Sequence, residues 1–149
     1  MSAASGATWP ASPVGSLRPD DLEFEVVEAV REIAATLSED VVVAWPDGEG
    51  GVFVVVDDID IGAQWTPQVT WLGCRILNAY PEADVYPLFV RGDLKRSDGA
   101  AFAAPFNPGS QFASQAAVTV SRTSPRRSPT TASAVARLIN TMNFLREAR

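Results

Sequence analysis

The order of segments along the chain predicts an α+β domain: an N-terminal helix, a four-stranded antiparallel meander sheet, an irregular loop and a C-terminal helix packed on one face. Two amphipathic stripes lie at the ends of the chain, and short β-branched and aromatic runs lie between them. Consecutive strands joined by short turns are typical of a meander. Residues 1–19, rich in Ala, Ser, Gly and Pro, are predicted to form a flexible arm, and residues 20–149 one domain.

The first predicted helix covers residues 20–40. Asp20 is a candidate N-cap and Glu23 follows three residues later, which is an aspartate variant of the capping box. Apolar residues then recur at spacings of three and four, namely Leu22, Val26, Val30, Ile33 and Leu37. This pattern predicts a helix of about five turns with one buried face.

Four extended segments are expected to form the meander, and they cover residues 41–45, 51–61, 68–76 and 85–90. The sequence PDGEGG between the first two is typical of a tight hairpin turn. Two Tyr-Pro steps, Tyr80-Pro81 and Tyr86-Pro87, separate the third segment from the fourth. Because proline removes a donor from a strand ladder, we expect both prolines at a strand start, an edge or an irregular crossing.

The second half of the chain carries weaker signals. Residues 91–114 contain Gly and Pro without a sustained period and are predicted to form a long loop. Residues 114–124 alternate enough for one more short extended segment. The closing helix is predicted to begin with Ser128 as cap and Pro129 at its first position. Its apolar stripe consists of Val135, Leu138, Ile139, Met142 and Leu145.

Composition limits the chemistry that this chain can perform. It contains no histidine, which excludes Ser-His-Asp triads, Cys-His pairs and His-containing zinc sites. Cys74 is the one cysteine, so neither a disulfide nor a four-thiolate metal site can form. We therefore expect no cofactor and no metal. The absence of a long apolar run and of a leader pattern predicts a cytoplasmic protein that does not enter membranes.

Charge divides the chain into an acidic and a basic part. Residues 1–90 carry three Arg against fifteen carboxylates, whereas residues 91–149 carry nine Arg or Lys against three carboxylates. One interpretation is that the two parts neutralise each other on a mixed surface. The other is a basic face that attracts an acidic partner, with Arg122, Arg126 and Arg127 as candidate binding residues. Nucleic acid is not expected, because the overall field is acidic.

Acidic and tryptophan side chains supply further candidate binding residues. Asp57, Asp58 and Asp60 close the second extended segment; they form either a solvated strand end or an acidic partner-binding face. Asp58 and Asp60 would share one face of a regular strand. Trp71 lies mid-strand and is predicted to be buried, while Trp45 and Trp65 flank turns and are candidates to cover the open side of the sheet.

The order of elements and the segment Tyr80-Pro81-Glu82-Ala83-Asp84-Val85-Tyr86-Pro87 resemble the ubiquitin-conjugating (E2) and RWD-like family. That family has a leading helix, four antiparallel strands and a YPxxxP motif before the fourth strand. The sequence VTVSRTSPRRSP followed by an amphipathic helix is also similar to bacterial E2-like proteins of ubiquitin-type conjugation systems. The resemblance covers residues 20–146 and implies E1-like, ubiquitin-like or JAB-type protein partners.

The sequence departs from this family where the family has its catalytic residues. Conjugating enzymes carry an HPN motif and a thioester-forming cysteine after the fourth strand, but residues 102–115 contain neither His nor Cys. Phe106-Asn107-Pro108 is the nearest match to HPN. Cys74 lies before Tyr80-Pro81, and on an apolar strand it is predicted to be a buried packing residue.

Three functions are compatible with the sequence. The first is an E2-like pseudoenzyme that binds other proteins of a bacterial ubiquitin-like pathway. The second is an acidic adaptor, an immunity protein or a chaperone-type binding protein. The third is a noncanonical conjugating enzyme that uses Cys74 as its nucleophile. The missing His and Cys favour a chain that is not an enzyme.

Overall fold

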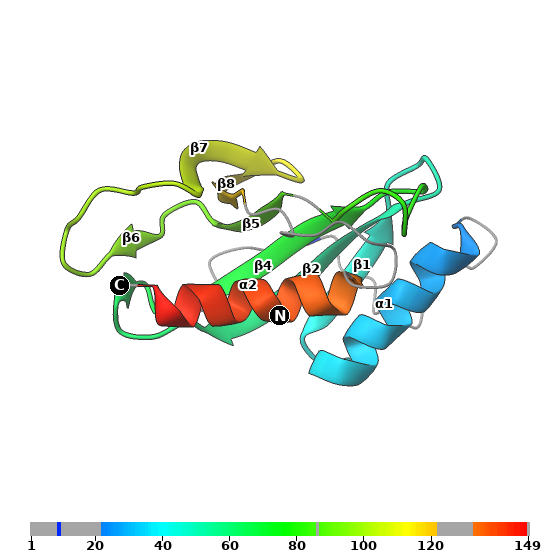
Figure 1. Cartoon of the computed structure of the whole chain (residues 1–149), viewed down its shortest axis with the longest axis horizontal. Helices are drawn as coiled ribbons and strands as arrows, with labels where there is room; N and C mark the ends of the chain where they lie inside the picture. The colour runs from blue at the N-terminus through cyan, green and yellow to red at the C-terminus, as the bar shows by residue number, and fades with distance from the viewer. Residues whose placement is uncertain (1–8, 10–21, 86, 122–132, 149) are drawn as a thin grey trace.

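The computed structural model describes residues 9, 22–85, 87–121 and 133–148. Figure 1 shows the helices and a curved sheet lying along one long axis. The elements are α1 (Phe24–Leu37), β1 (Val42–Pro46), β2 (Val52–Asp60), β3 (Trp65–Thr66), β4 (Val69–Ile76), β5 (Leu88–Arg91), β6 (Lys95–Arg96), β7 (Phe106–Phe112), β8 (Gln115–Val120) and α2 (Ala134–Glu147). The α+β class is therefore confirmed.

The main sheet has six strands rather than the four predicted, in the order β1-β2-β4-β5-β8-β7. The first four form the expected antiparallel meander, and the β7–β8 hairpin then pairs with β5 through β8. The expectation of one long loop over residues 91–114 is wrong, because β6 and β7 lie there. Pro108 and Gly109 are accommodated in β7 by an irregular register between Asn107 and Ser110. This bulge explains why the strand has no alternating pattern.

Both helices begin later than predicted. Helix α1 starts at Phe24 with Glu23 as its N-cap, and Asp20 lies outside the described residues. Helix α2 starts at Ala134, whereas Ser128 and Pro129 lie outside the described residues, and the Ser133 side chain accepts a hydrogen bond from the N–H of Ala136 at 3.2 Å. The Tyr80 hydroxyl accepts the N–H of Ala134 at 3.1 Å. These contacts satisfy two of the unpaired donors of the first helical turn.

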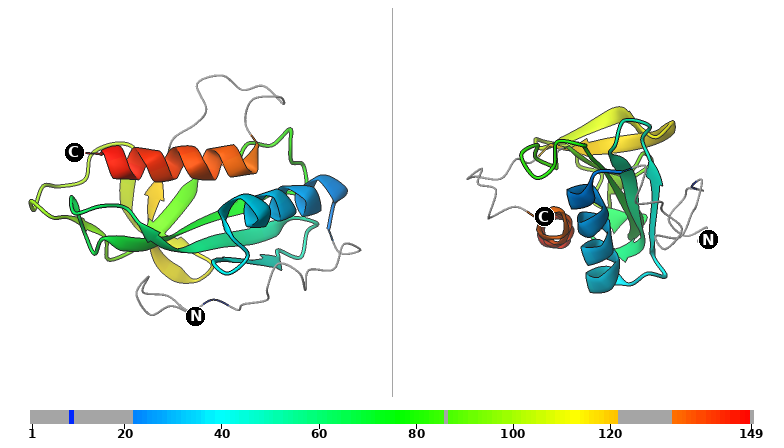
Figure 2. Two further views of the ribbon diagram at one scale, coloured as in Figure 1. Left: turned by 90° about the horizontal axis from the view of Figure 1, so that it is seen from below. Right: turned by 90° about the vertical axis from the view of Figure 1, so that its right-hand side faces the viewer.

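The helices lie on the same side of the six-stranded sheet, as both views in Figure 2 show. Strand residues facing them are almost all aliphatic, with Val54, Leu72, Cys74 and Val90 among those that are fully buried. Residues at the alternate positions face away from the helices, as the pleat of a strand requires. The sheet therefore has one face covered by helices and one that is not.

A two-stranded sheet, β3 paired with β6, lies beside the C-terminal end of α2. The indole N–H of Trp65 donates to the Leu145 carbonyl at 2.8 Å, and the Gln64 amide donates to the carbonyls of Leu145 and Arg146. These bonds satisfy carbonyls that the last turn leaves without helical partners. No helix in the described part of the chain is both long and apolar enough to span a bilayer.

Candidate functional site on the aromatic face of the sheet

The sheet face turned away from the helices is formed by aromatic rings. We call it the aromatic face and define it by Trp9, Trp45, Phe53, Trp71, Phe89 and Phe112. Phe112 lies at its centre, with ring centroids 5.0 Å from Phe89, 5.8 Å from Phe53 and 5.8 Å from Trp71. These separations are those of tilted and edge-to-face aromatic pairs, which stabilise each other beyond simple burial.

Gly73 allows the Phe112 ring to lie across strand β4. A Cβ atom at position 73 would stand 2.7 Å from Cε2 of Phe112, closer than real Cβ contacts come. Gly73 pairs with Val55 of β2 and with Phe89 of β5, so it occupies the middle of the sheet. A glycine inside a strand often marks such a close approach. The arrangement of the aromatic face thus depends on the absence of a side chain here.

An open groove of about 310 Å³ lies along this face. Phe53, Phe89 and Phe112 supply aromatic walls. The apolar Leu77 and Pro87 and the polar Arg75 and Gln111 also line it. Leu77 is 40% exposed, one of two large apolar side chains so exposed among the described residues. The volume and the mixture of apolar walls with a few polar groups are those of a binding groove.

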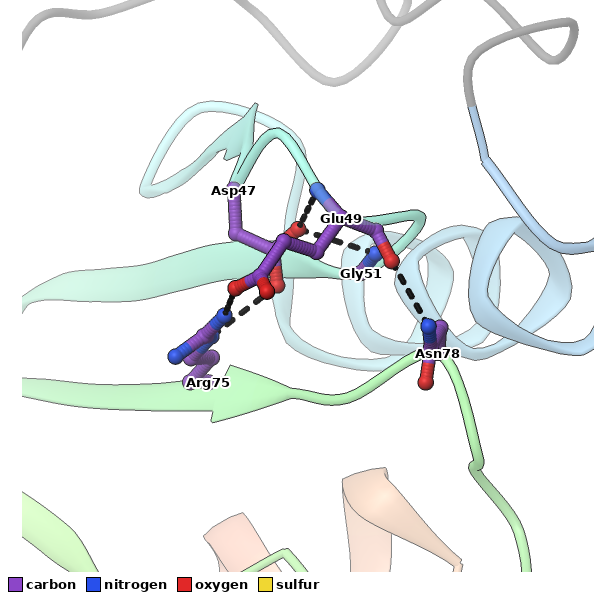
Figure 3. Close-up of polar contacts among 5 residues, drawn as sticks. All are labelled: Asp47, Glu49, Gly51, Arg75 and Asn78. Atoms are coloured by element: carbon purple, nitrogen blue, oxygen red, sulfur yellow. Dashed lines mark hydrogen bonds and ion pairs between the residues drawn. The ribbon is translucent and has the colours of Figure 1, made fainter.

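An ion-pair network fixes the position of Arg75 (Figure 3), which is one of the residues that line the groove. Arg75 Nε donates to Asp47 Oδ2 at 2.9 Å and Nη2 to Glu49 Oε2 at 2.6 Å. Asp47 also accepts the N–H groups of Glu49 and Gly51 through Oδ1. The guanidinium lies 5.5 Å from the centroid of the Phe53 ring. Arg75 is thus held between the β1–β2 turn and the aromatic face.

The same network changes the acidity of Asp47. Burial acts to raise the pKa of this carboxyl, but the N–H groups of Glu49 and Gly51 and the Arg75 guanidinium outweigh it and hold the pKa below its ordinary value. Only 1% of the Asp47 side chain is exposed, so its negative charge is compensated inside the protein rather than by solvent. Asp47 therefore stays ionised and fixes the turn.

Trp9 is the part of the predicted arm that the structure describes, and it is packed rather than free. Its ring is 8% exposed, with centroids 4.8 Å from Trp71, 6.0 Å from Trp45 and 6.0 Å from Phe112. Its buried indole N–H has no hydrogen-bond partner within the described part of the chain. The other residues of 1–19 lie outside the described ranges. A side chain from beyond the sheet thus already occupies part of the aromatic face.

The predicted acidic residues lie at the end of β2, away from the groove. Asp57 is half-buried, and Asp58 and Asp60 are exposed. Both lie exposed on either side of the buried Ile59, and the strand is irregular before that residue: the register shifts between Val56 and Ile59, and Asp58 has a positive φ of 56°. Asp60 is engaged locally: its carboxylate accepts the N–H of Gly62, and its carbonyl accepts Arg146 Nε.

Of the remaining predicted residues, the structure describes only Cys74, which does not line the groove. Arg122, Arg126 and Arg127 lie outside the described residues. Cys74 is fully buried on the helix-covered face, as predicted, and burial raises the pKa of its thiol to about 12 although Arg137 acts in the opposite direction. A thiol so placed is neither ionised nor reachable at neutral pH. Within the described ranges, no group of three His, Cys, Asp or Glu is placed to hold a metal.

The sequence did not identify the groove residues. Trp71 is buried as predicted, but Trp65 is 1% exposed in the helix-side core, so it does not cover the open side. Phe53, Trp71 and Phe89 lie at strand positions that face away from the helices. The alternation of side chains along each strand indicates this placement. Phe112 lies on β7, a strand that the sequence did not predict. Alternation therefore gave no indication that Phe112 lies at the centre of the aromatic face.

Comparison of this chain with protein-family models, curated protein sequences and solved structures gives no match. The coarse description that the structure supports is an α+β fold with a mostly antiparallel six-stranded sheet. Function is therefore inferred from the residues of this chain.

Proposed function

We propose that this chain is a non-catalytic, E2-like domain that binds other proteins through the groove on its aromatic face. The expected partners are an E1-like, a ubiquitin-like or a JAB-type protein of a bacterial ubiquitin-like pathway. The proposal combines the resemblance carried by Tyr80-Pro81 and the elements around it with the open groove. Binding requires no catalytic residue, so it is compatible with a chain that has no histidine and only one, buried, cysteine.

The packing of Trp9 is the observation that carries the proposal. Trp9 is separated from the first strand by more than thirty residues, yet its ring is received between Trp45, Trp71 and Phe112. The aromatic face therefore accepts a ring from a segment that is not part of the sheet. Phe112 also forms a wall of the neighbouring groove, which is open. A partner that inserts an apolar or aromatic side chain into this groove would use the same kind of contact.

Binding to purified candidate partners, followed by size-exclusion chromatography and titration calorimetry, tests this proposal. Leu77→Asp places a charge in the lining of the groove and is expected to weaken binding at least about tenfold, because the partner would bury an unpaired carboxylate. Phe24→Asp is the matched control: Phe24 is 71% exposed and belongs to α1, and its replacement should leave affinity unchanged. Equal losses in both variants, or no complex with any of the three partner classes, would refute the proposal.

The acidic adaptor remains a second candidate because Asp58 and Asp60 expose their side chains at one end of the sheet. Reversing the charges of Asp57, Asp58 and Asp60 together would abolish binding to a basic partner but leave a groove-dependent complex intact. The matched reversal of Arg122, Arg126 and Arg127 tests the basic residues in the same assay. Loss of binding in the aspartate variant alone would favour the adaptor over the groove.

The noncanonical enzyme receives no support from the site. The Cys74 thiol would have to lose its proton in a fully buried position where burial raises its pKa to about 12. Cys74→Ala is expected to retain every binding activity. A stable thioester with a ubiquitin-like protein in the wild type that disappears in this variant would reverse this conclusion.

A further inference from the structure

A second pocket, separate from the aromatic face, lies between residues 96–106 and the C-terminal end of α2. Its volume is about 380 Å³, a size suited to a small organic molecule. Phe102, Phe106 and Phe144 form an aromatic wall, with Phe106 stacked on Phe144 at 5.7 Å and 5.6 Å from Phe102. Arg96 and Asp98 are the charged residues that line it. We call it the Arg96 pocket.

The pocket is held in place by the small β3–β6 sheet. Trp65 pairs directly with Arg96, which puts both side chains on one face of that ladder. The Ser97 hydroxyl donates to the Ala63 carbonyl at 2.7 Å, and the Ala100 N–H donates to Asp98 Oδ1 at 2.9 Å. At the other end of the segment, the Ser121 N–H donates to the Pro105 carbonyl at 2.9 Å. The segment around the pocket is thus fixed at both ends.

Arg96 differs from every other arginine in the described ranges. Arg31, Arg75, Arg91 and Arg137 form ion pairs with carboxylates, and Arg146 donates to the Asp60 carbonyl. The Arg96 guanidinium lies 5.0 Å from the Trp65 ring centroid, and its buried Nε has no hydrogen-bond partner among the residues that the structure describes. A guanidinium has five N–H donors. Stacking on the Trp65 indole provides no hydrogen-bond acceptor for these donors, so their acceptors must come from other groups or from another molecule.

The residues around the pocket limit the charge of a ligand that can pair with the Arg96 guanidinium. Asp98 lines the same pocket, and the carbonyl end of α2 lies beside it, so a doubly charged anion meets repulsion from both. A single carboxylate meets less of it and still forms the paired hydrogen bonds that a guanidinium favours. The three phenylalanine rings require an apolar body on the same molecule.

From these observations we propose that the Arg96 pocket binds a small monocarboxylic acid with an aromatic or aliphatic body. The carboxylate pairs with the Arg96 guanidinium, and the body lies against Phe102, Phe106 and Phe144. Trp65 supports the guanidinium from behind and fixes its plane. This site is independent of the protein-binding groove, since the two have no lining residue in common.

Titration of the full chain with 3-phenylpropanoate, followed by ¹⁵N NMR shift mapping, tests the site. Saturable shifts are expected at residues 96–106 and at Phe144. The neutral 3-phenylpropanamide and the doubly charged phenyl phosphate are matched probes, and each should bind about tenfold more weakly or worse. Arg96→Gln should cause a loss of similar size, whereas Arg31→Gln, at an exposed ion pair on α1, should change nothing.

Three results would overturn the assignment: no saturable shift in the wild type at millimolar acid, equal affinity for acid and amide, or unchanged affinity in Arg96→Gln. Circular dichroism and thermal denaturation show whether Arg96→Gln remains folded. If it does not, Arg96→Lys replaces it, because the lysine keeps the charge and loses the bidentate fork. That variant should bind the acid more weakly than wild type while leaving the affinity for the amide unchanged; loss of both equally contradicts the proposal.

Discussion

The two faces of the six-stranded sheet differ in the side chains they carry and in what covers them. The helix-covered face is almost entirely aliphatic, with Val54, Leu72 and Val90 fully buried beneath α1 and α2. The aromatic face carries Phe53, Phe89 and Trp45, which are partly buried, around the buried Phe112. One face is therefore closed by secondary structure, and the other keeps a groove open to solvent.

Under the proposed function, this difference separates the residues that stabilise the fold from those that bind a partner. Branched aliphatic side chains fill the space under the helices densely, which stabilises the fold but offers nothing to a partner. Large aromatic side chains are enriched where proteins bind one another, because they bury much area with few rotatable bonds. Cys74 lies on the closed face and Arg75, its neighbour, on the open one. Adjacent residues of one strand thus lie on opposite faces of the sheet, one in the core and one at the groove.

The largest expected effect comes from a matched pair of leucines. Leu138 of α2 is fully buried on the closed face, so Leu138→Ala is expected to lower the free energy of unfolding by about 2–5 kcal/mol. Leu77, 40% exposed at the groove, should change it by no more than about 0.5 kcal/mol when replaced by alanine. Urea denaturation measures both. Similar losses in the two variants would mean that the two faces do not divide stability and recognition in this way.

A smaller effect is expected at Gly73, where strand β4 lies against the Phe112 ring of the aromatic face. Gly73→Ala brings a Cβ within 2.7 Å of Phe112 and is expected to cost about 1–3 kcal/mol, because the ring must move within a packed cluster. Thermal denaturation measures the cost, and NMR shifts of the Phe112 ring report the movement.

A double-mutant cycle supplies the control for Gly73. If the cost arises from the ring, Gly73→Ala should be much less harmful in a Phe112→Ala background than in the wild type. Additive losses would instead place the cost in the backbone of β4. In that case Gly73 does not control the shape of the aromatic face.

The parts of the fold that follow local rules were predictable from the sequence. The first four strands of the main sheet were predicted from residues 41–90 because Val-rich runs and the Asp47-Gly48 turn are local signals. Strand β7 was missed because Pro108 and Gly109 are turn residues by local preference, and only pairing with β8 across a bulge makes them part of a strand. The start of α2 at Ala134 was not predicted because one of its capping contacts comes from Tyr80, which is far away in sequence, and the other from Ser133.

The candidate site was less predictable than the fold. Alternation put Phe53 and Phe89 on one side of their strands, but it cannot show that both helices pack on the opposite side. The site depends on contacts between residues far apart in sequence, such as Trp9 with Trp71 and Gly73 with Phe112. Clusters of acidic or basic residues can be recognised in the sequence alone, but this local signal did not locate the groove. Asp57, Asp58 and Asp60 lie away from it.

The smallest effect concerns Asp47, which fixes Arg75 at the edge of the aromatic face. Its pKa in the folded protein is below the ordinary value, so the folded state favours the ionised form, and the resulting stability is fully present above the ordinary pKa. That stability is lost as the pH falls through the lower folded pKa. Asp47→Asn removes the charge while keeping an acceptor for the turn, and it should cost about 1 kcal/mol at pH 7. The difference from wild type should shrink as the pH falls below about 4.

Denaturant unfolding of both proteins across this pH range measures the effect, and subtraction removes the titrations that they share. Glu49→Gln is the matched control: Glu49 also pairs with Arg75, but its side chain is 73% exposed and its interaction is screened by water. Its cost should therefore be smaller than that of Asp47→Asn at every pH. The free energies of unfolding of wild type and Asp47→Asn could instead differ by a constant amount from pH 7 to pH 3. That result would show that the carboxylate charge does not stabilise this edge of the aromatic face, and that the turn is held by its backbone hydrogen bonds alone.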